Sequence, residues 1–410
     1  MMKWPLVASA VGACVLAVAC APKEAPRAAA WTLRVEPVAS PAGDASAQPQ
    51  LTASADGVLL SWLETAGAQT TLKYAARTAT GWSNATAVAS GRDFFTNWAD
   101  VPSVVRLSDH TLVAHWLQET DADAEAYDLR LSRSADDGRT WSPAFSPHHN
   151  GTKSEHGFAT LFDRREGGLG LVWLDGRAMT PPAARGEEST GDMRLMAASF
   201  DRGWTQRAEE AIDTRVCECC PTAAALTSEG VIVAFRNRSD DETRDIYVSR
   251  LVGGAWTAPA AVHNDGWHLN GCPVNGPAVS AIGRDVGIAW FTAPDDQGHA
   301  FVAFSQDVGR TFAAPVRVDD EGSIGRVDVE LLPDGSAVVA WIELADRRAA
   351  FKVRRVERSG QRSAAVTVTE LAGNRSSGYP RMARHDRELV FAWIGTGDRL
   401  RVQTGVARLP

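Results

Sequence analysis

The chain repeats one pattern seven times, at a period of about 50 residues, which points to a repeat architecture. In each copy a strand-like segment, a tight turn and a second strand-like segment ending on an aromatic residue follow one another. The copies read "PQLTASADGVLLSWLE", "PSVVRLSDHTLVAHWLQ", "FATLFDRREGGLGLVWLDG", "PTAAALTSEGVIVAFRNR", "PAVSAIGRDVGIAWFT", "VDVELLPDGSAVVAWIE" and "PRMARHDRELVFAWIG". Their terminal aromatics are Trp62, Trp116, Trp173, Phe235, Trp290, Trp341 and Trp393. Because these rings recur at one position of every copy, we interpret them as core contacts rather than as sugar-stacking residues.

Every copy continues with a third alternating segment, and most copies with a fourth, often opened by tryptophan as in "WTAPAAV". The seventh copy stops before its fourth segment. Residues 31–39, "WTLRVEPVA", have the fourth-segment pattern and precede the first copy. This arrangement predicts an all-β protein, a β-propeller of four-stranded antiparallel blades whose N-terminal strand completes the last blade. The repeat count favours seven blades, with six as the alternative.

Two turns after third segments match Ser-x-Asp-x-Gly-x-Thr-Trp/Phe, at residues 134–141 and 305–312, and residues 199–204 are a degraded copy. The aspartate of such a turn accepts hydrogen bonds from its own backbone, and the glycine adopts a backbone angle that other residues avoid. The turns resemble the Asp-box of the bacterial neuraminidase repeat. We therefore assign them a structural role, on the face opposite the expected site.

The N-terminus has the features of an export signal. Residues 1–19 combine a positive charge at Lys3 with an apolar run that is short for a membrane span. "LAVAC" resembles the lipobox of bacterial lipoproteins, which implies a lipid on Cys20, a flexible tether over residues 20–30 and one sialidase-like propeller over residues 31–410. Ordinary cleavage that leaves Cys20 unmodified is the alternative.

The expected location follows from this signal. The lipobox resemblance implies a lipid-anchored protein of the bacterial cell envelope, and Ala21 after the cysteine favours the outer membrane. A net charge of -8 disfavours nucleic acid as a partner. We predict a monomer whose partners are the membrane, through the anchor, and a glycan or another anionic small ligand.

Most unusual residues fall in the connections that lead from one blade to the next, which emerge on one face of a propeller. Arginine is frequent there, and a guanidinium grips a carboxylate or sulfate with two parallel hydrogen bonds. The mouth arginines are Arg92, Arg177, Arg215, Arg236, Arg238, Arg326, Arg375 and Arg381. A ligand site in a concave mouth is favoured, and ion pairing among the loops themselves is the alternative.

The chain resembles the sialidase (neuraminidase) superfamily, through its Asp-boxes and repeat layout. More narrowly it is similar to exported bacterial sialidase-like proteins with "NWAD", "EHGF", "LDGR", "CxCC" and "GCPVNGPA". The resemblance implies an exo-glycosidase acting on terminal sialic acid. In that family three arginines bind the carboxylate, a tyrosine assisted by a glutamate is the nucleophile, and an aspartate is the acid/base.

Carried onto this sequence, the family roles give Tyr379 as nucleophile, Asp100 as acid/base and Glu155 as the assisting carboxylate. The substrate-binding candidates are Arg177, Arg238 and Arg326. Tyr379 as a packing residue and Glu155 as a loop-orienting residue are the alternatives. The sequence lacks the Phe-Arg-Ile-Pro motif of the family and has seven repeats where the family has six, so enzymatic activity stays open.

Three functions are therefore carried forward. The first is a sialidase-like exo-glycosidase acting on a terminal acidic sugar at the cell envelope. The second is a non-catalytic propeller module that binds a glycan or peptide. The third is an envelope protein that binds metal through cysteines together with His156, His263 or His268.

Four cysteines lie in two adjacent mouth connections: Cys217, Cys219, Cys220 and Cys272. Export into an oxidising compartment favours disulfides among them. Three thiolates from one loop and a fourth from its neighbour could also surround zinc or copper(I), although Cys-x-Cys-Cys is not the usual Cys-x2-Cys spacing. Free thiols are the third alternative. No other cofactor is predicted.

Overall fold

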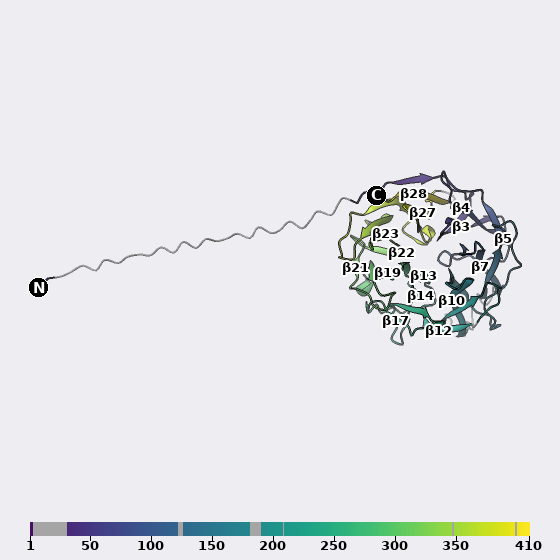
Figure 1. Ribbon diagram of the computed structural model, residues 1–410, viewed down its shortest axis with the longest axis horizontal. Coiled ribbons are helices and arrows are strands. Elements are labelled where there is room, and N and C mark those ends of the chain that lie inside the picture. The colour runs from purple at the N-terminus through teal and green to yellow at the C-terminus, as the bar shows by residue number, and fades with distance from the viewer. Residues whose placement is uncertain (3–30, 122–125, 181–189, 208, 347, 398–399) are drawn as a thin grey trace.

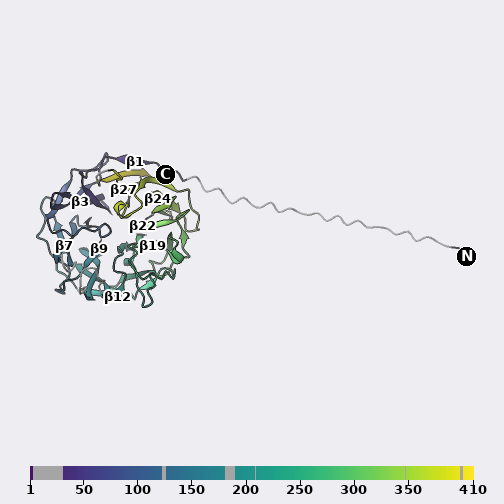
Figure 2. The ribbon, with the colours of Figure 1, turned by 180° about the vertical axis from the view of Figure 1, so that it is seen from behind.

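Seven small antiparallel sheets are arranged around a central axis in a closed ring (Figures 1 and 2). The computed structural model describes the chain except residues 3–30, 122–125, 181–189, 208, 347 and 398–399. The predicted signal, the tether and the lipidation site Cys20 lie outside the described residues. The seven-bladed propeller is confirmed, and six blades is wrong.

The blades follow the chain in order. Blade one contains β2 (Ser46–Ser54), β3 (Gly57–Ala66), β4 (Gln69–Ala76) and β5 (Thr86–Gly91), and blade two contains β6 (Ser103–Arg106), β7 (Leu112–Asp121) and β8 (Ala126–Ser134). Blade three contains β9 (His156–Asp163), β10 (Leu169–Thr180), β11 (Thr190–Phe200) and β12 (Glu210–Val216). Blade four contains β13 (Ala223–Thr227), β14 (Gly230–Arg236), β15 (Ile246–Val252), β16 (Ala255–Trp256) and β17 (Ala260–Ala261).

The remaining blades have the same plan. Blade five contains β18 (Ala278–Ile282), β19 (Asp285–Thr292), β20 (His299–Ser305) and β21 (Val316–Arg317), and blade six contains β22 (Ser323–Leu331), β23 (Ala337–Ala345), β24 (Arg348–Val356) and β25 (Val366–Leu371). Blade seven contains β26 (Arg381–His385), β27 (Glu388–Ile394), β28 (Val402–Arg408) and β1 (Val35–Val38). Two 3-10 turns, η1 (Pro294–Asp296) and η2 (Arg375–Ser377), lie in connections.

Blade two departs from the plan, because in its place for a fourth strand a single bridge joins Leu131 to Phe145. Blade seven is completed by the N-terminal strand β1, in which Val35 pairs with Ala407 of β28. The predicted closure of the ring by the N-terminal segment is therefore confirmed.

The recurring tryptophans form the cores between blades. Trp62, Trp173, Trp290 and Trp341 are fully buried, which confirms their interpretation as core residues. The indole nitrogens of all four donate to carboxylates: Trp62 to Glu64 at 3.3 Å, Trp173 to Asp175 at 2.8 Å, Trp341 to Glu343 at 2.6 Å and Trp290 to Asp265 at 2.6 Å. A buried indole N–H needs such an acceptor, so the acids near the tryptophans are part of the core.

The two Asp-boxes have the local structure that their sequence predicts. Asp136 accepts hydrogen bonds from the backbone N–H and the hydroxyl of Thr140, at 2.9 and 2.7 Å. Asp307 accepts the same pair from Thr311. Gly138 has a φ of +80°, a left-handed conformation that favours glycine. These turns stabilise blades two and five.

Candidate functional site

The connections from one blade to the next contact one another around the axis, and we call them the mouth loops. They are residues 39–45, 92–102, 146–155, 217–222, 262–277, 318–322 and 372–380. Trp98 from the second loop stacks on Tyr379 from the last, with ring centroids 5.9 Å apart. The Tyr379 hydroxyl in turn donates to the carbonyl of Val274 at 2.5 Å. These contacts tie three mouth loops together.

Asp100, Glu155 and the strand residue Tyr127 form an acid–base cluster at the mouth. The buried Asp100 carboxylate accepts the backbone N–H of Phe158 at 2.7 Å, and the Tyr127 hydroxyl donates to Glu155 at 3.3 Å. A Cβ on Gly157 would stand 2.1 Å from the Asp100 carboxylate, so only glycine lets strand β9 approach this closely. The structure thus brings together two of the three predicted catalytic residues.

Burial sets the protonation of this cluster. It raises the pKa of Asp100 to about 7; the Phe158 hydrogen bond opposes this shift and the charge of Glu155 adds to it. The pKa of Tyr127 lies well above its usual 10, first because of burial and then because of the neighbouring carboxylates. Near neutral pH about half of the Asp100 side chains hold a proton. Glu155 is only half-buried and is the member nearest to solvent.

Tyr379, the predicted nucleophile, is not the tyrosine that Glu155 contacts. It is buried, its hydroxyl donates to a backbone carbonyl, and burial raises its pKa. Sequence reasoning did not consider Tyr127. The signal that could have found it is its place at the start of a third strand, directly after a mouth-face connection.

The three predicted substrate-binding arginines have separate partners. Arg177 forms an ion pair with Asp175 at 2.6 Å and another with Glu209. Arg238 pairs with Glu242 at 2.7 Å and with Glu218. Ion pairing within the loops, the alternative considered for the mouth arginines, describes both of these residues.

Arg326 is buried and uses its guanidinium differently. It donates to the backbone carbonyls of Asn374 and Gly378 at 3.1 and 2.9 Å and to the hydroxyl of Ser377. The guanidinium carbon lies 4.7 Å from the ring centroid of Trp98. Arg326 therefore anchors the last mouth loop beneath the tryptophan.

A cavity of about 240 Å³ opens beside Trp98, between blades one and seven. Its lining includes Gln48, Leu63, Ile394 and the exposed Arg375, whose guanidinium carbon is 5.8 Å from the Trp98 ring centroid. An aromatic face next to a guanidinium suits a sugar that carries a carboxylate or sulfate.

A second cavity of about 220 Å³ follows the axis and is lined by the innermost strand of each blade. Asp328 and Glu330 of β22 face it together with Arg381 of β26. Burial, followed by the charge of Asp328, raises the pKa of Glu330 to about 8. This carboxyl is therefore mainly protonated at neutral pH.

We expect Glu330 to make the protein less stable in alkali. A carboxyl whose pKa is raised on folding stabilises the folded state below its unfolded pKa, and this stability is lost as pH rises through the folded pKa. The free energy of unfolding should fall between pH 5 and 9 by at least about 1 kcal/mol through this group, since channel water screens part of the effect. Urea titrations of wild type and Glu330→Gln across this range should show a shallower fall in the variant. An unchanged slope would contradict the assignment, and the exposed Glu321→Gln is the control.

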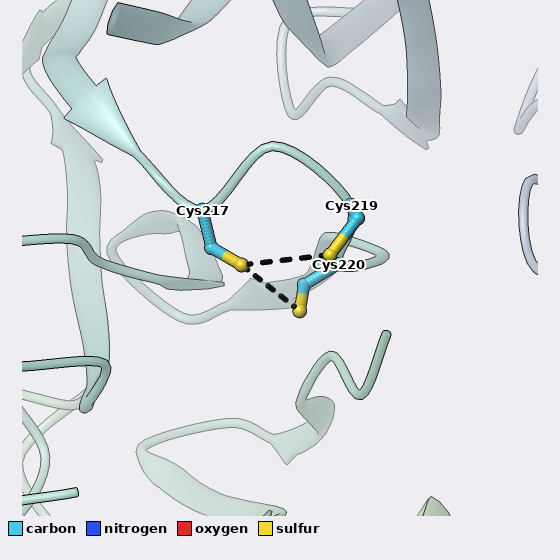
Figure 3. Close-up of side chains that lie close together, drawn as sticks. All are labelled: Cys217, Cys219 and Cys220. Carbon is cyan, nitrogen blue, oxygen red and sulfur yellow. Dashed lines mark hydrogen bonds between the residues drawn. The ribbon is translucent and has the colours of Figure 1, made fainter. Parts of the chain in front are cut away.

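The mouth cysteines lie close together as thiols (Figure 3). The Cys217 sulfur is 3.8 Å from that of Cys219 and 3.3 Å from that of Cys220, and Cys272 interacts with Cys219. None of these four described cysteines forms a disulfide in this structure. The disulfides remain a prediction, and the convergence of the two loops is confirmed.

The histidines considered as partners of the cysteines lie elsewhere. The His156 ring stacks on that of His148, and both lie within 4.8 Å of the Asp128 carboxylate. The Nδ1 atom of His263 is 2.8 Å from a carboxylate oxygen of Asp265. The backbone of His268 forms an isolated antiparallel β-bridge with that of Thr243. Among the described residues, the cysteine cluster contains no histidine.

Comparison with known proteins identifies the fold. No protein-family model and no curated protein sequence matches the chain. Among solved structures, the polysaccharide lyase Uly1 is similar over 90% of this chain and 91% of its own, with a TM-score of 0.53 and 12% identity. A PL25 ulvan lyase bound to -[GlcA(1-4)Rha3S]- is similar over 78% of this chain and 80% of its own (TM-score 0.50, 12% identity). The endosialidase of phage phi92 is similar over 92% of this chain and 69% of its own (TM-score 0.50, 9% identity).

At these identities the likeness shows a shared propeller fold. In the part of the chain that the structure describes, no helix is both long and apolar enough to span a membrane.

Proposed function

We propose that the protein is a glycosidase that releases a terminal acidic sugar, in the manner of a sialidase, at the mouth of its propeller. The observation that carries the proposal is the meeting of two carboxyl groups and a tyrosine, Asp100, Glu155 and Tyr127, on mouth loops and an adjacent strand. The shared fold of proteins named as polysaccharide lyases and an endosialidase supports a carbohydrate substrate.

The cluster can perform acid–base chemistry at neutral pH. Glycoside cleavage needs one group that protonates the leaving oxygen and a second that acts as nucleophile or base. Asp100 carries the proton, since its pKa is raised to about 7. Glu155 accepts the hydrogen bond of Tyr127 and is positioned to take the tyrosine proton if the phenol attacks the sugar. A buried carboxyl that keeps its proton beside a second, more exposed carboxyl is typical of such a pair of roles.

The cavity beside Trp98 supplies a place for the acidic sugar. A sugar ring can pack on the indole while its carboxylate meets Arg375, the exposed guanidinium of this cavity. Trp98 and Asp100 are two residues apart on one mouth loop. Substrate binding and proton transfer would thus be coupled by a short segment of chain. If the predicted export signal and lipid anchor are present, they would place this activity at the cell envelope.

A panel of fluorogenic substrates tests the proposal. Purified protein lacking residues 1–30 is incubated with α-sialosides, β-glucuronides and a neutral galactoside, and the released fluorophore is measured. We expect turnover of an acidic substrate and none of the galactoside. Absence of turnover on every acidic substrate would overturn the proposed activity. Trp98→Ala should raise KM more than it lowers kcat, because it removes the binding surface and not the proton donor.

Binding without cleavage is the second candidate, favoured by one observation. The Tyr379 hydroxyl is held by a backbone carbonyl, and Arg177 and Arg238 are already paired with acids. A mouth whose charged side chains are already paired can bind a ligand on its surface without catalysing its cleavage. Retention of an acidic glycan on immobilised protein, lost in Trp98→Ala and unaccompanied by hydrolysis, would support this candidate over the first.

A further inference from the structure

Three thiols of one mouth loop lie close together, and a fourth thiol from the next mouth loop interacts with one of them. The sulfurs of Cys217, Cys219 and Cys220 all lie within 4.8 Å of one another (Figure 3). Cys272, from the next loop, reaches the same group through Cys219. Cys217 and Cys220 are buried, Cys219 is half-buried and Cys272 is exposed. The cluster thus extends from the interior to the surface of the mouth.

Backbone contacts also hold the two loops against each other. The backbone N–H of Asn275 donates to the Cys220 sulfur at 3.3 Å. A Cβ on Gly276 would lie 1.9 Å from the carbonyl oxygen of Pro221. Only glycine therefore lets the backbones of the two loops approach this closely. The fold therefore holds the loop of Cys272 against the loop that carries the other three cysteines.

An arginine side chain contacts the buried end of the cluster. The guanidinium of Arg244 donates to the Cys217 sulfur at 3.2 Å. The guanidinium of Arg244 also pairs with Glu218, the residue between Cys217 and Cys219 in the loop. Hydrogen bonds from N–H groups to sulfur are also the usual outer support of metal-bound ligands.

We propose that Cys217, Cys219, Cys220 and Cys272 form a closed four-thiolate site for a soft d10 cation, Zn²⁺ or Cu⁺. Zinc–sulfur bonds of about 2.3 Å in a tetrahedron place the sulfurs about 3.8 Å apart. The separations of 3.8 and 3.3 Å from Cys217 are close to this value. Soft sulfur ligands select these two ions over magnesium or calcium.

The site is structural rather than catalytic. Four protein ligands leave no open position for water or substrate, which is the arrangement of structural zinc sites. The bound ion would join the connection between blades three and four to the connection between blades four and five. It would fix these two mouth loops in the absence of a disulfide.

The other group of candidate ligands in the described residues is less suited to an ion. Asp128, His148 and His156 lie close together, but the two imidazoles are stacked face to face, with centroids 3.9 Å apart and planes within 2°. A metal ion binds in the plane of an imidazole, and two stacked rings share no such point. The histidine cluster therefore serves as the internal control.

Metal content of the purified protein tests the proposal without any substrate. Protein prepared without chelator, in parallel from media supplemented with zinc and with copper under reducing conditions, is analysed by elemental and native mass spectrometry. We expect about one equivalent of zinc or copper per chain. Cys219→Ser should lose it, and His156→Gln should retain it. Cobalt(II) loaded into the metal-free protein should give the sulfur-to-metal charge-transfer bands of a tetrahedral thiolate site.

Each contrary outcome is decisive. Less than about a tenth of an equivalent of either metal, together with a mass about 4 Da below the reduced chain, would mean two disulfides and would overturn the site. If Cys219→Ser retained the metal and His156→Gln lost it, the metal site would be the histidine cluster and not the cysteines. If Cys219→Ser does not fold, Cys272→Ser alters only the exposed ligand, and competition with a chelating dye should show affinity lowered by at least about 10-fold. Unchanged affinity would contradict the fourth ligand.

Discussion

Replacing Asp100 by asparagine is expected to lower kcat/KM on the acidic substrate by about 10²- to 10⁴-fold, the usual contribution of a positioned proton donor. Asparagine keeps an oxygen that can accept the Phe158 N–H at the same place. The fold should therefore survive while the transferable proton is lost. Because the donor must be protonated, wild-type kcat/KM should fall as pH rises above about 7, the pKa of Asp100, and this limb should vanish in the variant.

The matched control for this variant is Asp213→Asn. Asp213 lies on β12, the outermost strand of blade three, and its pKa is also raised by burial. It accepts hydrogen bonds from Arg215 and Asn237 and has no contact with Glu155 among those described. Its kinetics and pH profile should match wild type. Equal losses in both variants, or a pH limb that persists in Asp100→Asn, would remove Asp100 from the chemistry.

Trp173→Ala is expected to lower the free energy of unfolding by about 3 to 5 kcal/mol. The indole is fully buried between blades two and three, among side chains such as Leu131 and Met196, and its removal leaves a cavity that the rigid blades cannot fill. Asp175 also loses the indole N–H that it accepts at 2.8 Å. Urea unfolding followed by far-ultraviolet circular dichroism measures the change.

Trp393→Ala tests whether burial, and not the repeat position, determines this loss. Trp393 occupies the corresponding place in blade seven but is only partly buried. We expect a loss of about half that of Trp173→Ala, in proportion to the smaller apolar area removed from water. A loss below about 1 kcal/mol at Trp173, or equal losses at both positions, would contradict the core assignment.

The architecture followed from the sequence because each blade repeats the same local signals. The period-two strands, the Asp-box turns and the spare fourth-strand pattern of residues 31–39 all agree with one topology, which the structure confirms. Agreement between local signals and the global fold is what makes such a prediction secure. The loop faces were predictable for the same reason, since strand order alone determines them.

The site was predictable only as a region. Sequence reasoning placed Asp100 and Glu155 at the mouth, but the partner of Glu155 depends on which side chain of blade two reaches 3.3 Å from it, and that is Tyr127. The pairing of Arg177 and Arg238 with acids also depends on loop conformation. The Tyr127–Glu155 contact joins blade two to the mouth loop that follows it, and the arginine pairs depend on side-chain conformation, so the alternating strand pattern of the repeat encodes neither.

The pairing of β1 with β28 has a consequence for folding during synthesis. β1 pairs with β28, which lies far along the chain, so β1 has no strand partner until β28 has been made. Contacts between distant parts of a chain form late, because the intervening loop must be closed first. Until then the ring has an open edge that can pair with another chain. Ring closure is therefore the step that removes this open edge.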